Sequence, residues 1–224
     1  MPSDDSIVFL FDVDNTLLDN DALKADLRSQ LGALLGPALN TRFWEIYETV
    51  RHERGVVDLP LTLERLAPLC SDPALAARAQ AIVMEYPFAS RLFPATPAAL
   101  AHAGTIGTPA ILSDGDAVFQ PYKIARSGLA ADVAGRVLVF EHKDQHLAEV
   151  MAAWPAALYV AVDDRAPILA ALARQQPQRV VTVHVRQGHY ANDPPAGPAP
   201  DITLASIGDL QSLSAADLWR HARR

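Results

Sequence analysis

Two carboxylates stand at the end of the first apolar run of this chain. Residues 7–11 are apolar and mostly β-branched or aromatic, which predicts a buried strand that ends at Asp12. Asp14 follows two positions later, and Asn15 and Thr16 suit a turn that leaves the strand. Carboxylates this close repel each other and are costly to bury, so they imply a bound cation or a shared proton. An acid-rich surface turn is the other interpretation of this motif taken alone.

Three later apolar runs also end in polar residues that could act on a phosphoryl group. Ser113 follows one run, Lys143 follows the next, and the pair Asp163 and Asp164 follows a third. In a parallel sheet the carboxyl ends of the strands lie along one edge, where ligands bind. We therefore expect these side chains to converge with the first two acids although they are far apart in the sequence.

The elements that must position these residues alternate between helix and strand from about residue 88. Strands are predicted over residues 110–112, 136–140, 158–162, 179–185 and 202–204. Helices are predicted over residues 96–103, 116–127, 144–153 and 166–174, with a loop over 191–200 and one or two helices after Ser206. This alternation predicts an α/β fold with a Rossmann-like parallel sheet, helices on both faces and the first strand near the centre.

Residues 19–86, between the first two strands, carry only helical patterns. Asp19, Asn20 or Asp21 suits the start of the first helix, and Gly36-Pro37 is expected to break it. Such an insertion is longer than an ordinary crossover between strands. We predict an all-α cap domain of residues 19–86 on an α/β core domain of residues 1–18 and 87–224, with further cap helices over residues 41–54, 62–69 and 72–85.

With these motifs the chain resembles the haloacid dehalogenase superfamily of hydrolases, most of which are phosphatases. The stretch from Asp12 to Thr16 is similar to the first family motif, Asp-x-Asp-x-Thr. Ser113 matches the second motif, Lys143 the third, and Asp163-Asp164 the acidic pair of the fourth. The helical segment lies where the family carries a cap domain.

The resemblance implies a hydrolase that cleaves a phosphate monoester through an aspartyl-phosphate intermediate. Asp12 would be the nucleophile, and Asp14 would protonate the leaving oxygen and then take a proton from the hydrolytic water. Ser113 and Lys143 would hold phosphate oxygens, together with backbone N–H groups at the start of the helix expected from Asp116.

The resemblance also implies a Mg²⁺ cofactor, since the acids and a phosphate dianion would otherwise repel one another. Its ligands would be Asp12, the backbone carbonyl of Asp14 and Asp164, with Asp163 as a further ligand or as a support for the others. Residues near the expected phosphate position and at the end of a cap helix are candidates for substrate contacts: Asp114, Gly115, Arg51 and Arg54.

Several of these residues also have a plainer structural explanation. Ser113, or the pair Asp163-Asp164, could simply cap the helix that follows. Lys123 rivals Lys143 as the phosphate-binding lysine. We prefer Lys143 because a cation at a helix start needs an anion opposite it, whereas Lys123 within a helix could be solvated. Arg51 and Arg54 equally suit a solvated helix end, and Trp44 and Tyr47 the packing of the cap.

Other functions share parts of this pattern. A phosphotransferase or phosphomutase would keep both acids, and only the acceptor would differ. A 2-haloacid dehalogenase of the same superfamily resembles the chain in its nucleophile but lacks the second acid, so Asp14 argues against it. A receiver-like signalling module, from a different class, is typically shorter and has its phosphorylated Asp after a later strand.

The composition of the chain limits the kinds of molecule that it is expected to bind. The net charge of −7 argues against binding to nucleic acid, whose footprint is a basic face. No apolar stretch approaches the ~20 residues of a membrane helix, and no basic segment precedes the first apolar run as in a secretory signal. One cysteine, Cys70, fits a reducing compartment. We expect a soluble, cytoplasmic enzyme that acts on a small phosphorylated metabolite.

Overall fold

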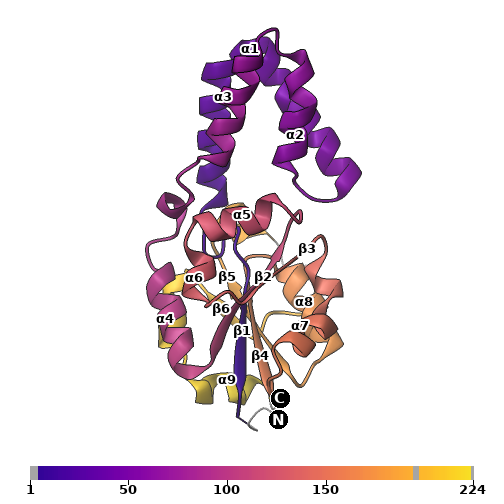
Figure 1. Cartoon of the computed structure of the whole chain (residues 1–224). Coiled ribbons are helices and arrows are strands. Elements are labelled where there is room, and N and C mark those ends of the chain that lie inside the picture. The colour runs from indigo at the N-terminus through magenta and orange to yellow at the C-terminus, as the bar shows by residue number, and fades with distance from the viewer. Residues whose placement is uncertain (1–4, 194–196, 223–224) are drawn as a thin grey trace.

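Six parallel strands form one sheet at the centre of the protein (Figure 1). The computed structural model describes residues 5–193 and 197–222, so the ends of the predicted core domain and positions 194–196 of the predicted loop lie outside the described residues. The strand order is β3-β2-β1-β4-β5-β6, and the predicted central place of the first strand is confirmed because β1 pairs with both β2 and β4. The strands are β1 Ile7–Phe11, β2 Thr108–Asp114, β3 Val137–Phe140, β4 Leu158–Asp163, β5 Val180–Val185 and β6 Ile202–Leu204.

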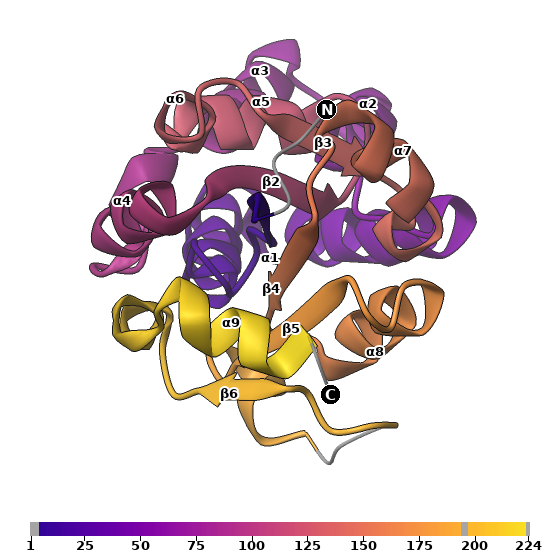
Figure 2. The ribbon, with the colours of Figure 1, turned by 90° about the horizontal axis from the view of Figure 1, so that it is seen from below.

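Helices cover both faces of this sheet, as predicted (Figure 2). Alternate residues of β1 enter two hydrophobic clusters, with Phe9 and Phe11 on one side and Val8 and Leu10 on the other. Burial on both faces explains why the run before Asp12 is apolar throughout. The first face carries α4 (Thr96–Ile106), α5 (Phe119–Arg126), α6 (Leu129–Asp132) and α9 (Ala215–Ala222), and the second α7 (Leu147–Ala153) and α8 (Ala166–Gln175).

Three helices lie together beyond the carboxyl ends of the strands (Figure 1). These cap helices are α1 (Asn20–Arg54), α2 (Leu59–Leu66) and α3 (Pro73–Met84). Each begins at an aspartate whose side chain accepts a hydrogen bond from a backbone N–H of the first turn: Asp19, Asp58 and Asp72. None of their residues joins the sheet, and the division into two domains at residues 18/19 and 86/87 stays a prediction.

Some boundaries differ from the sequence prediction. Gly36 does break α1, with φ of 70° and ψ of 170°, but helical structure resumes directly at Pro37 and not at residue 41. Helix α5 begins at Phe119 and not at Asp116, because Asp116 Oδ1 accepts the N–H groups of Val118 and Phe119. Short 3₁₀ helices complete the chain: η1 Ala67–Leu69, η2 Phe88–Arg91, η3 Lys143–Gln145, η4 His189–Asn192 and η5 Ile207–Ser212.

In the part of the chain that the structure describes, no helix combines the length and the apolar character that crossing a membrane requires. Even α1, the longest helix, carries charged residues along its length.

The two connections between the cap helices and the sheet lie side by side. Phe93 N–H donates to the Leu17 carbonyl at 3.0 Å, and Asp19 N–H donates to the Arg91 carbonyl at 2.7 Å. The Tyr86 hydroxyl donates to Asp26 at 2.6 Å, and Arg91 bonds both of these side chains. The base of α1 is therefore tied to the segment that leads back into the core.

Phe88, at this junction, provides a test of the packing. Its side chain is 1% exposed and its ring contacts those of Tyr86, Phe119 and Tyr122. We expect Phe88→Ala to leave a cavity and to lower the free energy of unfolding by about 3–5 kcal/mol, measured by urea denaturation. Val118→Ala, at a side chain that is 67% exposed, should change it by less than about 0.5 kcal/mol. Equal effects of the two substitutions would contradict the packing described.

Candidate active site

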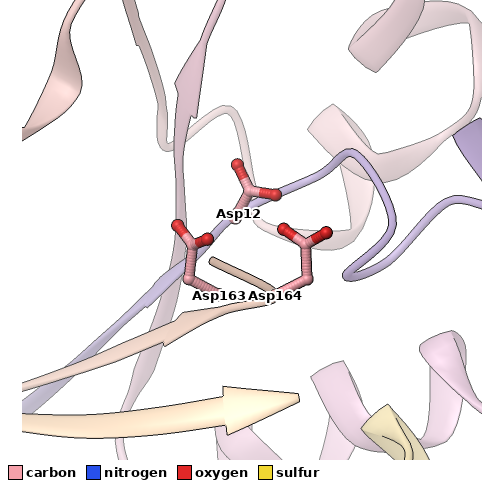
Figure 3. Close-up of side chains that lie close together, drawn as sticks. All are labelled: Asp12, Asp163 and Asp164. Atoms are coloured by element: carbon pink, nitrogen blue, oxygen red, sulfur yellow. The ribbon is translucent and has the colours of Figure 1, made fainter. Parts of the chain in front are cut away.

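Three buried carboxylates meet at the carboxyl edge of the sheet. Asp12 follows β1, Asp163 ends β4 and Asp164 comes next, and β1 and β4 are neighbours. One carboxylate oxygen of each lies within 4.8 Å of those of the other two (Figure 3). Their exposed fractions are 6%, 3% and 2%. The structure thus brings together the first and fourth motifs, as the strand order requires.

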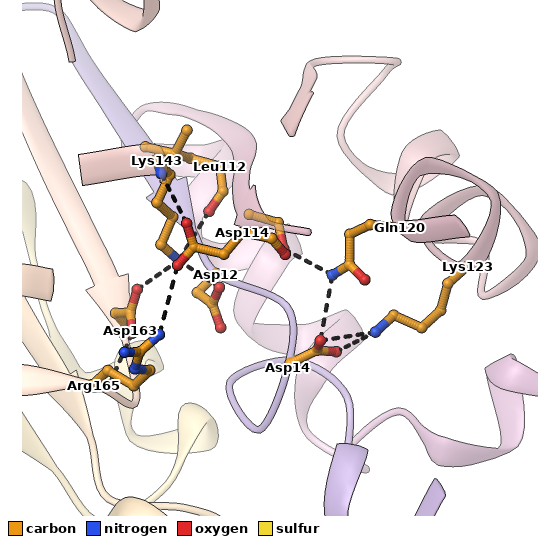
Figure 4. A network of polar contacts seen from close by, with 10 residues as sticks. Asp12, Asp14, Leu112, Asp114, Gln120, Lys123, Lys143, Asp163 and Arg165 are labelled. Atoms are coloured by element: carbon orange, nitrogen blue, oxygen red, sulfur yellow. Dashed lines mark hydrogen bonds and ion pairs between the residues drawn. The ribbon is translucent and has the colours of Figure 1, made fainter. Parts of the chain in front are cut away.

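Lys143 lies against this carboxylate cluster (Figure 4). Its Nζ is 2.5 Å from Asp12 Oδ1 and 2.7 Å from Asp163 Oδ2, and it also donates to the Leu112 carbonyl at 3.3 Å. Asp114, a candidate for substrate contacts, accepts the backbone N–H of Lys143 at 2.8 Å. Asp114 therefore orients the loop that carries the lysine.

Burial dominates the electrostatics of the cluster. It raises the pKa of Asp12 to about 7, against the lowering effect of Lys143 and with further raising by Asp163. It raises the pKa of Asp164 to about 9, with help from Asp12 and Asp163. For Lys143, burial acts to lower the pKa, but Asp12 and Asp163 raise it by more, so it stays above its usual range. Among the described residues, three acidic side chains face one ammonium, so the cluster has a deficit of positive charge.

The free oxygens of the cluster fit a hard divalent cation. Both oxygens of Asp163 are engaged, one by Lys143 and the other by the N–H of Arg165 at 2.8 Å. Asp164 Oδ2 is buried and, within residues 5–193 and 197–222, has no hydrogen-bond partner. Oxygen donors of this kind suit Mg²⁺. The contacts thus favour Asp12 and Asp164 as ligands, with Asp163 as the residue that holds Lys143 in place.

Asp14 is paired separately from this cluster (Figure 4). Lys123 Nζ lies 2.6 and 2.8 Å from its two oxygens, and Gln120 Nε2 donates to Asp14 Oδ2 at 3.4 Å. The interpretation of Lys123 as a solvated helix residue is wrong, because it is 3% exposed. Sequence reasoning missed Gln120. Both residues share the buried face of α5 with Phe119 and Ile124, and this helical spacing was the available signal.

Ser113 lies within β2 and is 1% exposed. Its hydroxyl accepts from Gln120 Nε2 at 2.9 Å, so the interpretation of Ser113 as a helix cap is wrong, and Asp116 takes that role. The sequence also predicts that backbone N–H groups after Asp116 hold phosphate oxygens. For Val118 and Phe119 this prediction is wrong, because their N–H groups already donate to Asp116 Oδ1.

A cavity of about 340 Å³ lies between the cap helices and this edge of the sheet. Asp12, Asp14 and Asp164 line it from the core. Three of the predicted substrate contacts line it, namely Asp114, Gly115 and Arg51, whereas Arg54 is exposed and is not among the lining residues. Sequence reasoning missed several lining residues: Asn20, Lys24, His142, Arg165, His189 and Tyr190.

The loop after Asp14 is fixed by Asn15. Its side-chain oxygen accepts the N–H groups of Asn20 and Asp21 at 3.1 and 3.2 Å, which ties the start of α1 to the motif. Gly188 packs directly on it, with φ of 63°, and a Cβ there would lie 2.5 Å from Asn15 Cγ. A side chain at position 188 would therefore displace the loop that carries both acids.

A parallel α/β sheet that carries an acid cluster at its carboxyl edge, beneath inserted helices, is the architecture of a large class of hydrolases. A protein from Burkholderia xenovorans named as a haloacid dehalogenase-like hydrolase is 47% identical to this chain, over 93% of this chain and 99% of its own, with a TM-score of 0.85. The chain belongs to the haloacid dehalogenase-like hydrolases.

More distant solved structures share the fold. L-2-haloacid dehalogenase from Xanthobacter autotrophicus is 19% identical over 95% of this chain and 98% of its own, with a TM-score of 0.55. A magnesium-bound HAD hydrolase from Bacillus subtilis is 15% identical over 92% of this chain and 97% of its own, with a TM-score of 0.62. The chain matches no model of a known protein family and no curated protein.

The cluster makes a prediction about metal binding. We expect Mg²⁺ to raise the stability of the wild-type protein, by about 2.7 kcal/mol at a concentration a hundred times the dissociation constant. Asp164→Asn should abolish this effect without lowering the stability of the metal-free protein, because burial raises the pKa of Asp164 to about 9 and the amide replaces a side chain that is already mostly neutral at pH 7. Thermal unfolding with and without Mg²⁺ measures both quantities.

Asp193→Asn is the matched control, since Asp193 is exposed and lies outside the cluster. It should keep the full response to Mg²⁺. An equal response of the Asp164→Asn protein would show that the ion binds elsewhere.

Proposed function

We propose that this hydrolase is a Mg²⁺-dependent phosphatase that cleaves a small phosphate monoester through an aspartyl-phosphate on Asp12. The observation that carries the proposal is the second acid. Asp14 lines the same cavity as Asp12 but has its own partner, Lys123. A reaction with both a covalent step and a proton transfer to the leaving oxygen needs two acids with separate roles.

Asp12 and Asp14 carry out different parts of the reaction. An oxygen of Asp12 attacks phosphorus, and the bond from phosphorus to the leaving oxygen breaks as Asp14 gives that oxygen a proton. Water then attacks the phosphoenzyme, Asp14 takes its proton, and phosphate leaves with Asp12 regenerated. Lys143, 2.5 Å from Asp12, offsets negative charge throughout. Asp12 and Asp164 would hold Mg²⁺, which would supply the positive charge that lets a phosphate dianion approach.

Attack on a carbon–halogen bond is a weaker account of this site. A halide leaves without a proton, so Asp14 and its buried partner Lys123 would have no step to perform. The Xanthobacter haloacid dehalogenase described above is 19% identical to this chain, which speaks to the fold alone. The small cavity beneath the cap helices favours a diffusible metabolite as substrate. The free cysteine Cys70 suits the reducing cytoplasm as its location.

The two acids can be tested separately with an aryl phosphate, whose good leaving group needs little protonation. In Asp12→Asn the attacking anion is absent, so a rapid-quench experiment with labelled substrate should trap no phosphoenzyme. In Asp14→Asn the nucleophile remains, so label should accumulate on Asp12. Turnover of alkyl phosphates in this variant should fall roughly 10²–10⁴-fold.

If the Asp12→Asn variant hydrolysed phosphate esters at the wild-type rate, Asp12 would not be the nucleophile. If the wild type and Asp14→Asn released halide from 2-chloropropionate equally fast, the result would favour a dehalogenase that does not use Asp14. Omission of Mg²⁺ provides a control for both variants.

A further inference from the structure

The wall that the cap helices contribute to the cavity is cationic. Among the lining residues that the structure describes, every acid comes from the core side: Asp12, Asp14, Asp114, Glu141, Asp144 and Asp164. The cap helices contribute the cations Lys24 and Arg51 and no acid. Arg51 lies at the exposed rim and pairs with Glu48 at 3.4 Å, so Lys24 carries the charge that remains unbalanced.

Lys24 is half-buried and, within residues 5–193 and 197–222, makes no hydrogen bond or ion pair. Asn20 precedes it by one helical turn, so both side chains project from the same face of α1. Asn20 is only 8% exposed, and its side-chain amide likewise has no partner among the described residues. The Asn20 amide and the Lys24 ammonium stay accessible from the cavity, so a ligand there can supply contacts that the protein does not.

Tyr47, from the second half of α1, adds a donor. It is 7% exposed, lines the same cavity, and its hydroxyl has no hydrogen-bond partner in the described part of the chain. Burial raises its pKa to about 12, with a lowering effect of Arg51 and a raising effect of Asp14. The phenol is thus neutral at physiological pH and can donate a hydrogen bond.

We propose that Asn20 and Lys24, with the Tyr47 hydroxyl, form a subsite for a carboxylate that the substrate carries in addition to its phosphate. The inference rests on the proposed phosphatase activity and specifies its substrate class. Lys24 supplies the charge, Asn20 and Tyr47 supply hydrogen bonds, and the phosphate lies near Asp12 in the same cavity. An ammonium and two neutral donors match a carboxylate, which only accepts hydrogen bonds.

The remaining wall and the volume define the body of this substrate. The apolar lining from the cap is Leu23, Leu27, Trp44, Val56, Val57 and Leu59. A cavity of about 340 Å³ lies at the small end of the range of about 300–1,000 Å³ that is usual for ligand pockets, which favours a compact ligand. The class is therefore a compact phosphate monoester with an aliphatic or aromatic body and one carboxylate.

Two non-hydrolysable probes test the subsite on the full chain with Mg²⁺. These are para-(phosphonomethyl)benzoate and its neutral carboxamide, which share shape and phosphonate and differ in the charge of the distal group. Isothermal titration calorimetry should show about 10–100-fold tighter binding of the carboxylate to the wild type. Lys24→Met should remove this preference, and Lys24→Arg should keep most of it. Arg42→Met, on an exposed part of α1 outside the cavity, should keep it fully.

Equal affinity of the wild type for the two probes, or an undiminished preference in Lys24→Met, would overturn the subsite. Hydrolysis of para-carboxyphenyl phosphate, assayed beside the neutral carboxamide ester, separates the two proposals. Turnover without a carboxylate preference overturns the subsite and leaves the phosphatase standing. Carboxylate-dependent binding of the probe without hydrolysis of any phosphate ester supports the subsite and overturns the phosphatase.

Discussion

The rest of this structure depends on one constraint, the repulsion between acidic side chains that are buried together at the carboxyl edge of the sheet. Asp12, Asp163 and Asp164 share a small volume, and in the part of the chain that the structure describes Lys143 is the one cation paired with this cluster. Because β1 and β4 are buried on both faces, water can screen these charges only from the cavity. Loss of Lys143 would leave the buried acids without their cation, a change that typically costs about 3–5 kcal/mol. The acids outnumber the ammonium even with Lys143 in place, so the set still favours a bound cation.

The two acids of the first motif receive different environments from different parts of the fold. Asp12 is held by Lys143, which comes from η3 after β3, and Asp14 is held by Lys123 and Gln120 of α5. Asp12 is almost fully buried, whereas the Asp14 side chain is 32% exposed toward the cavity. Separate partners and separate burial are what allow two identical side chains, two residues apart, to take different chemical roles.

The cap helices complete this charge distribution from the opposite side. Their wall of the cavity is apolar and cationic, and the core wall is acidic, so a ligand with an apolar body and anionic ends would contact both. The paired connections at Leu17–Asp19 and Arg91–Phe93, with the Asp26–Tyr86–Arg91 contacts beside them, hold α1 over the site. Asn15 links the same helix to the loop of the two acids, so the position of the cap wall and the position of the acids are mechanically connected.

Local sequence determined the elements of this protein and the edge at which its acids meet. The apolar run before Asp12, the alternation after residue 88 and the aspartates at the helix starts act through neighbours in the chain, and these predictions hold. Only the tertiary structure decided that Lys123 is buried against Asp14 and that Gln120 donates a hydrogen bond to the Ser113 hydroxyl. It also decided that both oxygens of Asp163 have partners, whereas Asp164 Oδ2 has none among the described residues. These contacts join segments up to about a hundred residues apart. Whether a side chain is solvated, paired or available to a ligand depends on what packs against it, which no local pattern encodes.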